Sequence, residues 1–378
     1  MRTRINKTDY LLSLIREGKK MALKQQLKLT VYLSIPAIMT QLSSIVMQYV
    51  DASMVGSLGA NASASIGLGS TTTWLFWGLC AAAATGFSVQ VAHLIGAGNF
   101  AGARKILRQS ITATLLFGSS LAAIGVFISD SLPGWLGGDE IIRKDSSVYF
   151  LIFSLFLPVL QMNFLASGML RCSGNMYIPS ILNILMCLLD IIFNFFLIFP
   201  KRQIEIMGLN IDIYGAGLGV KGAALRTVLA ELVTAGGMMW YLCYRSPILK
   251  LSGERGHFLL RQDTLRNAVR ISFPMGFEHI AICGAQIMTT IIVAPLGIIA
   301  IAANSFAIIA ESLCYMPGYG ISEAATTLVG QSLGANRLKL LRRFANIDYG
   351  NHGCIYVYSS PANHRRNDSD RRNQNVRN

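Results

Sequence analysis

The sequence predicts an all-α integral membrane protein built from two helical lobes. Of its 378 residues, 52% are hydrophobic and only 14% are charged, and the mean hydropathy is +0.46. A soluble domain of this length does not need so apolar a composition. Apolar segments of membrane-spanning length recur along the chain, and one set of motifs occurs twice. Composition, segment length and repetition therefore indicate the same class of protein.

Eight apolar segments are long enough to cross about 30 Å of hydrocarbon. The second and the eighth exceed that length, so we expect them to tilt or to include turns at the membrane surface. The first 28 residues are polar and carry eight Lys or Arg, which is not the pattern of a cleavable signal. The predicted spans are residues 29–55, 63–95, 106–129, 148–170, 178–199, 223–244, 269–294 and 300–333.

The net charge of +14 reflects how the basic residues are distributed. With these spans, 22 of the 33 Lys and Arg lie on the side of the N-terminus, six lie on the other side, and five lie in the C-terminal tail. This asymmetry predicts a cytoplasmic N-terminus. We expect a multi-pass protein of the plasma membrane, the inner membrane in a bacterium. We therefore expect the lipid bilayer, and not nucleic acid, as the partner of the basic residues.

The sequence lacks the motifs of the common enzyme classes. It contains no GxSxG, no P-loop and no HExxH, so we predict that it is not an enzyme and does not use ATP. Its seven cysteines form no CxxC pair, so neither disulfides nor a bound metal is expected. No cofactor is predicted, and a coupling ion, H⁺ or Na⁺, would take its place.

The fifth span, residues 178–199, carries a polar stripe. Asn183, Cys187, Asp190 and Asn194 fall within about 60° of one another on a helix. A carboxylate at the centre of a bilayer costs about 3 kcal/mol or more, so Asp190 should face a protein interior or a wet cavity. Such residues mark ion or substrate pathways, which predicts a transporter.

The first span carries a second polar stripe, formed by Gln41, Ser44, Gln48 and Asp51. If the first and fifth spans face each other, Asp51, Asp190, Asn194 and, on the same face, Asn183 would form a site for a proton or sodium ion. An alternative for Asp51 is a place at the membrane interface, near the outer end of its helix.

The two spans after residue 268 carry a further set of candidate residues. Glu278, Asn304, Glu311 and Tyr315 are predicted to line the cavity or to contact substrate, together with Gln41, Ser44 and Gln48. Asn304, Glu311 and Tyr315 share a helical face, and their oxygen and aromatic groups suit an organic cation or a sodium ion. Hydrogen bonding between helices explains the second-lobe residues equally well. Pro36 removes one helical hydrogen bond from the first span and is predicted to act as its hinge.

An internal repeat relates the two parts of the chain. Ser34-Ile35-Pro36 corresponds to Ser272-Phe273-Pro274, and Leu58-Gly59 corresponds to Leu296-Gly297 at the same offset. Farther on, we expect a slightly shifted offset that pairs Gly86 with Gly320. Because six spans separate the copies, the two lobes should have the same orientation and enclose a central cavity.

These motifs resemble those of the multidrug and toxic compound extrusion (MATE) transporters. The resemblance rests on Ser34-Ile35-Pro36 with Asp51–Gly56, on the loop Leu94–Asn99, on Arg171–Asn175 and on Ala324–Ala335, and it extends from about residue 28 to 346. It implies twelve spans in two six-helix lobes, and export of organic, often cationic, compounds in exchange for H⁺ or Na⁺ by alternating access. It also implies an Asn followed by an Asp in the fifth span, whereas this chain has Asp190 followed by Asn194.

The resemblance gives a domain plan in which the second lobe is partial. We expect a cytoplasmic N-terminus at 1–28, a six-helix lobe at 29–244, a cytoplasmic linker at 245–268, the first two helices of a second lobe at 269–346, and a polar, disordered tail at 347–378. The tail replaces four expected spans, as a frameshift or truncation would. The alternatives to a monomeric drug exporter are a flippase of lipid-linked saccharides and a non-functional fragment.

Overall fold

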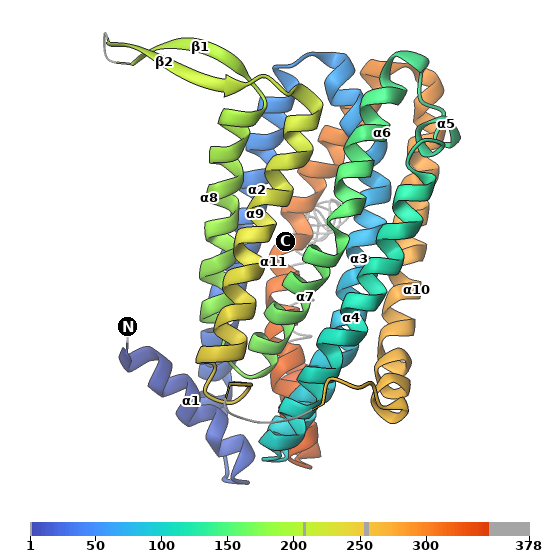
Figure 1. The fold of residues 1–378 in the computed structure, drawn as a ribbon. Coiled ribbons are helices and arrows are strands. Elements are labelled where there is room, and N and C mark those ends of the chain that lie inside the picture. Colours follow the sequence, from blue (N-terminus) through green and yellow to red (C-terminus); the bar gives the residue numbers. More distant parts are fainter. Residues whose placement is uncertain (1, 207–208, 253–256, 348–378) are drawn as a thin grey trace, which may run out of the picture.

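The computed structural model describes residues 2–206, 209–252 and 257–347. Its long helices stand side by side in one elongated bundle (Figure 1). Residues 338–347 add a further helical segment. In chain order the elements are α1 (Arg2–Arg16), α2 (Leu23–Gly56), α3 (Ala60–Gly96), α4 (Phe100–Ile128), α5 (Leu132–Trp135), α6 (Glu140–Leu155), α7 (Leu157–Cys172), α8 (Tyr177–Leu197), β1 (Pro200–Ile206), β2 (Leu209–Ala216), α9 (Gly219–Trp240), a π-turn (Tyr241–Arg245), α10 (Gln262–Val293), a 3₁₀ turn (Ala294–Leu296) and α11 (Ile298–Gly334).

The number of membrane spans differs from the predicted eight. In the described part of the chain, six helices are long and apolar enough to cross a membrane, and the bent pair α6 and α7 would make a seventh span. The predicted span 223–244 corresponds to α9, which carries Lys221, Arg226 and Glu231. These charges lower the hydropathy of α9, so it does not reach the composition of a lipid-length helix. It nevertheless packs between α8, α6 and α7 as a full member of the bundle.

The predicted fourth span, 148–170, is broken into α6 and α7 with a bend of 49°. The break falls at Phe156, and Pro158 is the second residue of α7. Proline has no backbone N–H and its ring excludes the preceding turn, so a helix restarts there instead of continuing.

Helix α1 and the hairpin of β1 and β2 were not predicted. The segment predicted as a basic cytoplasmic N-terminus contains α1, for which no helix was predicted, and the all-α prediction omitted the antiparallel hairpin of β1 and β2, in which Ile204 pairs with Ile211. Figure 1 shows α1 and the hairpin at opposite ends of the bundle. The predicted linker 245–268 is also shorter than expected, because α10 begins at Gln262. The predicted tail, 347–378, lies outside the described residues except for Ile347.

Helix α1 is held by its apolar face. Leu12 and Ile15 are fully buried in a cluster that includes Leu29 of α2, Leu328 of α11 and Phe344. Arg337, beyond the end of α11, donates a hydrogen bond of 3.0 Å from Nη1 to the carbonyl oxygen of Leu14. Helix α1 therefore bridges α2 and α11, which belong to different halves of the repeat.

The repeat is visible as a constant offset of 238 residues. We refer to α2–α9 as the first lobe and to α10 and α11 as the second. Helices α3 and α11 have 37 residues each, and both begin after a glycine with positive φ, Gly59 at 103° and Gly297 at 102°. Beyond their ends, Gly98 (φ 74°) corresponds to Asn336 (φ 57°). The predicted shift of the offset near Gly86 is therefore wrong for these helix ends.

The two repeats touch through a reciprocal contact between α3 and α11. A Cβ atom on Gly96 would collide with the backbone of Gln331, and one on Gly334 would collide with the backbone of His93. Gly96 and Gly334 are equivalent positions, as are His93 and Gln331. Only glycine allows the backbones to approach this closely. The lobes are thus joined near the end of the bundle that carries α1.

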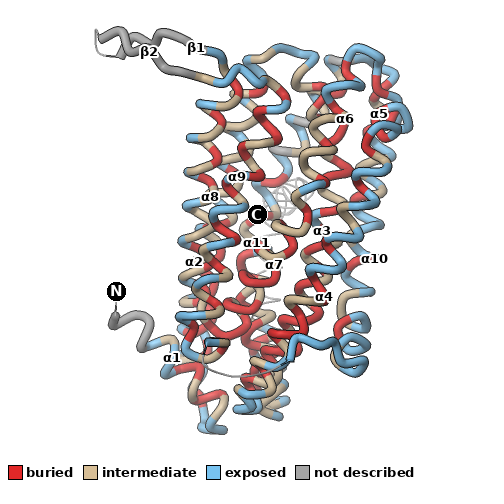
Figure 2. The backbone as a smooth tube through the Cα atoms, viewed as in Figure 1, coloured by how far each residue is buried: buried red, intermediate tan, exposed pale blue. Residues whose placement is uncertain are grey.

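The outer faces of several helices are apolar and exposed, as a lipid-facing surface should be. Phe127 is 88% exposed, and Phe273 and Ile299 are also largely exposed. Figure 2 shows buried residues on the inner faces of the helices, while much of α10 is exposed. Water would not favour such a surface, whereas the hydrocarbon of a bilayer would cover it.

Candidate functional site

An ionic triad lies inside the first lobe, where three helices meet. Nη1 of Arg226 on α9 lies 2.7 Å from Oδ1 of Asp51 on α2, and it also forms an ion pair with Oδ2 of Asp190 on α8. Nδ2 of Asn194 donates a hydrogen bond of 2.8 Å to Oδ1 of Asp51. We call this ionic triad, together with Asn194, the triad site. It links α2, α8 and α9.

The triad site is almost entirely removed from solvent. Asp190 is 1% exposed, Asn194 is fully buried and Arg226 is 6% exposed, while the Asp51 side chain retains 17% exposure. Burying a charge is unfavourable unless it is paired and hydrogen-bonded. Two carboxylates face one guanidinium, so the site carries a net charge of −1 when all three groups are ionised.

The pairing leaves several buried polar atoms unsatisfied. Oδ1 of Asp190, Oδ1 of Asn194 and Nε of Arg226 have no hydrogen-bond partner among the described residues. An unsatisfied buried acceptor costs about 1–3 kcal/mol, so these oxygens favour the arrival of a proton or a small cation.

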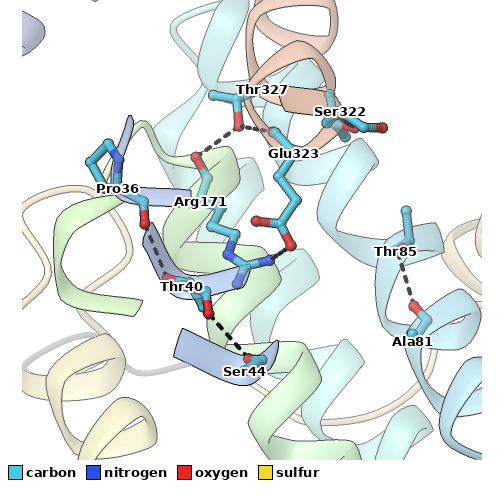
Figure 3. Close-up of polar contacts among 10 residues, drawn as sticks. Pro36, Thr40, Ser44, Ala81, Thr85, Arg171, Ser322, Glu323 and Thr327 are labelled. Carbon is cyan, nitrogen blue, oxygen red and sulfur yellow. Dashed lines mark hydrogen bonds and ion pairs between the residues drawn. The ribbon is translucent and has the colours of Figure 1, made fainter. Parts of the chain in front are cut away.

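A second ion pair connects the two lobes. Arg171, in the last turn of α7, pairs with Glu323 of α11, and Oγ1 of Thr327 donates a hydrogen bond of 3.0 Å to the Arg171 carbonyl oxygen. Figure 3 shows the Arg171 side chain directed toward Glu323. One turn farther along α11, Nε2 of Gln331 donates to the Cys172 carbonyl oxygen at 2.9 Å. We call these three contacts the interlobe latch.

The family model MatE matches residues 36–196 and 274–348. The chain belongs to the MatE family. The resemblance drawn from the sequence motifs is thereby confirmed, and the family is one of membrane transporters and not of enzymes. Helix α9, with Arg226, lies between the two matched segments.

Curated relatives and solved structures agree with this assignment. The chain is 28% identical over 306 residues to a probable multidrug resistance protein NorM of Thermotoga maritima, covering 80% of this chain and 62% of that protein. It therefore spans less than two thirds of that relative. It has the fold of a MOP superfamily transporter from Pyrococcus furiosus (TM-score 0.78, 21% identity, 92% of this chain and 72% of that one). An outward-facing MATE family transporter gives a TM-score of 0.77 at the same identity and coverage.

The MatE fold brings together three of the predicted coupling residues, namely Asp51, Asp190 and Asn194. The described hydrogen bonds of the triad site do not involve the fourth, Asn183, which is half-buried two turns away on α8. Asp51 is paired with Arg226 inside the lobe, and its side chain is 17% exposed. The spacing of polar residues on the two helices had predicted that Asp51 comes close to Asp190 and Asn194 if the helices face each other.

The other polar residues of the first stripe lie along the same side of α2. Ser44 contacts Cys187 of α8, and its hydroxyl also donates to the Thr40 carbonyl oxygen at 3.1 Å. Gln41 and Gln48 are half-buried. The stripe therefore follows the packing between α2 and α8, with Asp51 at its far end.

The second-lobe candidates do not reach the triad site. Glu278 and Glu311 are exposed, whereas Asn304 and Tyr315 are half-buried. The Tyr315 ring lies edge-on to Tyr319, with 5.7 Å between the ring centroids. These residues belong to α10 and α11, which pack mainly on α3 and α2.

Arg226 is the residue of the triad site that the sequence analysis missed. It was counted with the basic residues of an outer loop, although it falls inside the predicted span 223–244. A charged residue inside a span is unusual enough to mark a site. The same helix carries Glu231, whose Oε2 accepts a hydrogen bond of 2.6 Å from Nδ2 of Asn163 on α7.

Pro36 lies inside α2, which is one helix over its whole length. Because proline has no N–H, the carbonyl oxygen of Tyr32 lacks its helical donor. Oγ1 of Thr40 donates a hydrogen bond of 3.1 Å to the Pro36 carbonyl oxygen (Figure 3). Such a local side-chain bond competes with the helical ladder and favours bending at this position.

Proposed function

We propose that this chain is a secondary active antiporter, which exports organic, often cationic, compounds in exchange for H⁺ or Na⁺ by alternating access. The observation that carries the proposal is the buried triad of Asp51, Arg226 and Asp190 in a bundle of lipid-length helices. Ionisable groups in such a bundle are costly and are typical of ion pathways. The name of the Thermotoga relative, a probable multidrug resistance protein, supports export of drugs.

In this proposal the triad site couples ion binding to helix movement. Asp51, Asp190 and Asn194 receive the ion, and Asn183 extends the same face of α8. An added proton or cation neutralises the net charge of −1 and weakens the attraction of Arg226 for one of its partners. Helices α2, α8 and α9 are then free to shift, and α2 bends at Pro36.

The substrate would bind between the lobes. Helix α2 packs on α8 with one side and on α11 with another, so its movement changes both lobes. We propose that Gln41, Ser44 and Gln48 contact substrate from the first lobe, and Glu278, Asn304, Glu311 and Tyr315 from the second. The carboxylates of Glu278 and Glu311 would attract organic cations.

The sidedness follows from the basic residues. We propose that the α1 end is cytoplasmic, because most Lys and Arg lie at that end of the predicted topology. The interlobe latch and the contact of Gly96 with Gln331 close the bundle there. In this proposal the structure is closed toward the cytoplasm. We also propose that the protein works as a monomer.

Efflux of a fluorescent organic cation from membrane vesicles, under imposed proton and sodium gradients, tests the proposal. We expect gradient-dependent export by the unchanged chain and background export by Asp190→Asn. The matched control is Asp145→Asn, which neutralises an exposed carboxylate on α6. Absence of export by the unchanged chain under both gradients would contradict the proposal.

A further inference from the structure

Arg226 occupies the position in which a bound cation would balance the two carboxylates. Its Nη1 contacts Oδ1 of Asp51 and Oδ2 of Asp190 at the same time. One oxygen of each carboxylate is therefore already directed at a positive charge. That charge is covalently attached to α9 and is 6% exposed, so it stays in the lobe whatever ions the solution contains.

A metal cation and a proton differ in what they need from this site. A hard cation binds through several oxygen ligands at once. Here two of the carboxylate oxygens already bind Arg226, and the guanidinium repels any second cation placed between Asp51 and Asp190. A proton needs only one acceptor atom. Oδ1 of Asp190, buried and without a hydrogen-bond partner among the described residues, is such an atom.

We infer that Arg226 is a built-in cation that makes the triad site selective for protons over sodium ions. The inference deepens the proposed function, because it names the coupling ion. Only the expected effect on transport rests on the proposed function. The charge balance is simple: the site changes from −1 to neutral when one proton binds, with Arg226 charged throughout.

The neighbouring groups add no second cation to the triad site. Tyr149 of α6, Cys187 of α8 and Glu231 of α9 are the other titratable groups that face the triad site in the described part of the chain. Tyr149 and Cys187 are neutral in their ordinary state near pH 7. Glu231 is bound to Asn163 and is five residues from Arg226 along α9. None of them supplies a second positive charge.

Sodium binding by the purified protein tests the inference without any transport. Thermal unfolding is followed in detergent, in sodium chloride and in choline chloride at equal ionic strength. We expect no sodium-specific change in Tm for the unchanged chain. Arg226→Gln frees both carboxylates and keeps a side chain that can hydrogen-bond Asp51, and we expect sodium to raise its Tm by about 3 °C or more.

Two controls separate charge from structure. Arg226→Lys keeps a positive charge and should remain insensitive to sodium. Lys221→Ala removes an exposed cation from the same helix and should also remain insensitive. If Arg226→Gln does not fold in choline chloride but folds in sodium chloride, the inference is supported equally.

Two results of the unfolding measurement would overturn it. The first is a sodium-specific rise in the Tm of the unchanged chain that Asp190→Asn abolishes, which would show that sodium binds beside Arg226. The second is an Arg226→Gln protein that folds but ignores sodium. If that variant fails to fold in both salts, the smaller Arg226→Ala is measured with the same two outcomes.

The transport measurement then distinguishes this inference from the proposed function. We expect a proton gradient to drive export by the unchanged chain, with no contribution from a sodium gradient. Loss of all export would contradict the proposed antiport, while the Tm data would still decide which ion the site accepts. Export driven by sodium alone would contradict the inference and leave the antiport intact.

Discussion

Arg171 forms an ion pair with Glu323, and this contact joins the last turn of α7 to α11. Both side chains are mostly withdrawn from solvent, at 18% and 23% exposure. Thr327 holds the backbone of Arg171 from the same face of α11. Because the pair crosses between the lobes, it must break whenever the lobes separate at the α1 end.

We predict that Glu323→Gln weakens the closed arrangement by about 1–2 kcal/mol, as expected for a partly buried pair. Spin labels on the exposed Lys105 and Lys339, measured as a distance distribution, should show a larger open population. The exchanged pair Arg171→Glu with Glu323→Arg should restore the closed population. Glu17→Gln, which removes an exposed pair with Lys19, is the control; an equal effect there would refute a specific latch.

Replacing either glycine of the reciprocal contact should push α3 and α11 apart. Gly96→Ala and Gly334→Ala each place a Cβ atom against a backbone that cannot move aside as a side chain would. We expect each to destabilise the closed protein by about 1–3 kcal/mol, seen as a lower Tm. The matched control is Gly236→Ala on α9, where nothing lies within 4 Å of an added Cβ. Equal decreases in Tm for Gly96→Ala and Gly334→Ala support the symmetry of the two contacts. A decrease in only one variant would argue against it.

Within the triad site, the order of destabilisation should follow the number of charges left unpaired. Arg226→Ala leaves two carboxylates without a cation and should cost about 3–5 kcal/mol. Asp190→Asn should cost less, because Arg226 keeps Asp51 at 2.7 Å. Thermal unfolding in choline chloride measures both. If Asp190→Asn proved the more harmful, Arg226 would not be the centre of the site.

Helix α1 should detach when its buried face is reduced. We predict that Leu12→Ala costs about 2–5 kcal/mol of α1 docking, because Leu12 is fully buried in the cluster. Trypsin should then cut faster at Arg16, Lys19 and Lys20. Tyr10→Ala, at a residue that is 59% exposed, should leave the rate unchanged. Equal cleavage of the two variants would show that α1 is not held by this face.

The sequence predicted the elements whose cause is local. Apolar runs of membrane-spanning length predicted α2, α3, α4, α8, α10 and α11. Most of the predicted ends lie within a few residues of the ends of these helices, since span length follows from hydropathy alone. Helical spacing placed Asp190 and Asn194 on one face, and their meeting with Asp51 followed once α2 and α8 were assumed to pack. The bend at Pro158 and the charges of α9 explain why fewer helices than the predicted eight have the length and composition of a membrane span.

The remaining features depend on tertiary packing. Nothing in the pattern around Leu12 and Ile15 says that α1 docks on α2 and α11, because the residues of α2 and α11 in the same cluster are distant in sequence. Arg226 was misread because a basic residue near a span boundary looks the same whether it points to water or to two carboxylates. Its partners on α2 and α8 are 175 and 36 residues away in sequence.

The reciprocal contact between Gly96 and Gln331, and between Gly334 and His93, has a consequence for how such a chain arises. In two identical half-length chains paired about a twofold axis, one glycine per chain creates both contacts at once, and any mutation there acts twice. If the two halves are fused into one chain, Gly96 and Gly334 are encoded separately and can mutate independently. Each lobe can then specialise alone, and a single inserted charge such as Arg226 no longer has to be tolerated in duplicate.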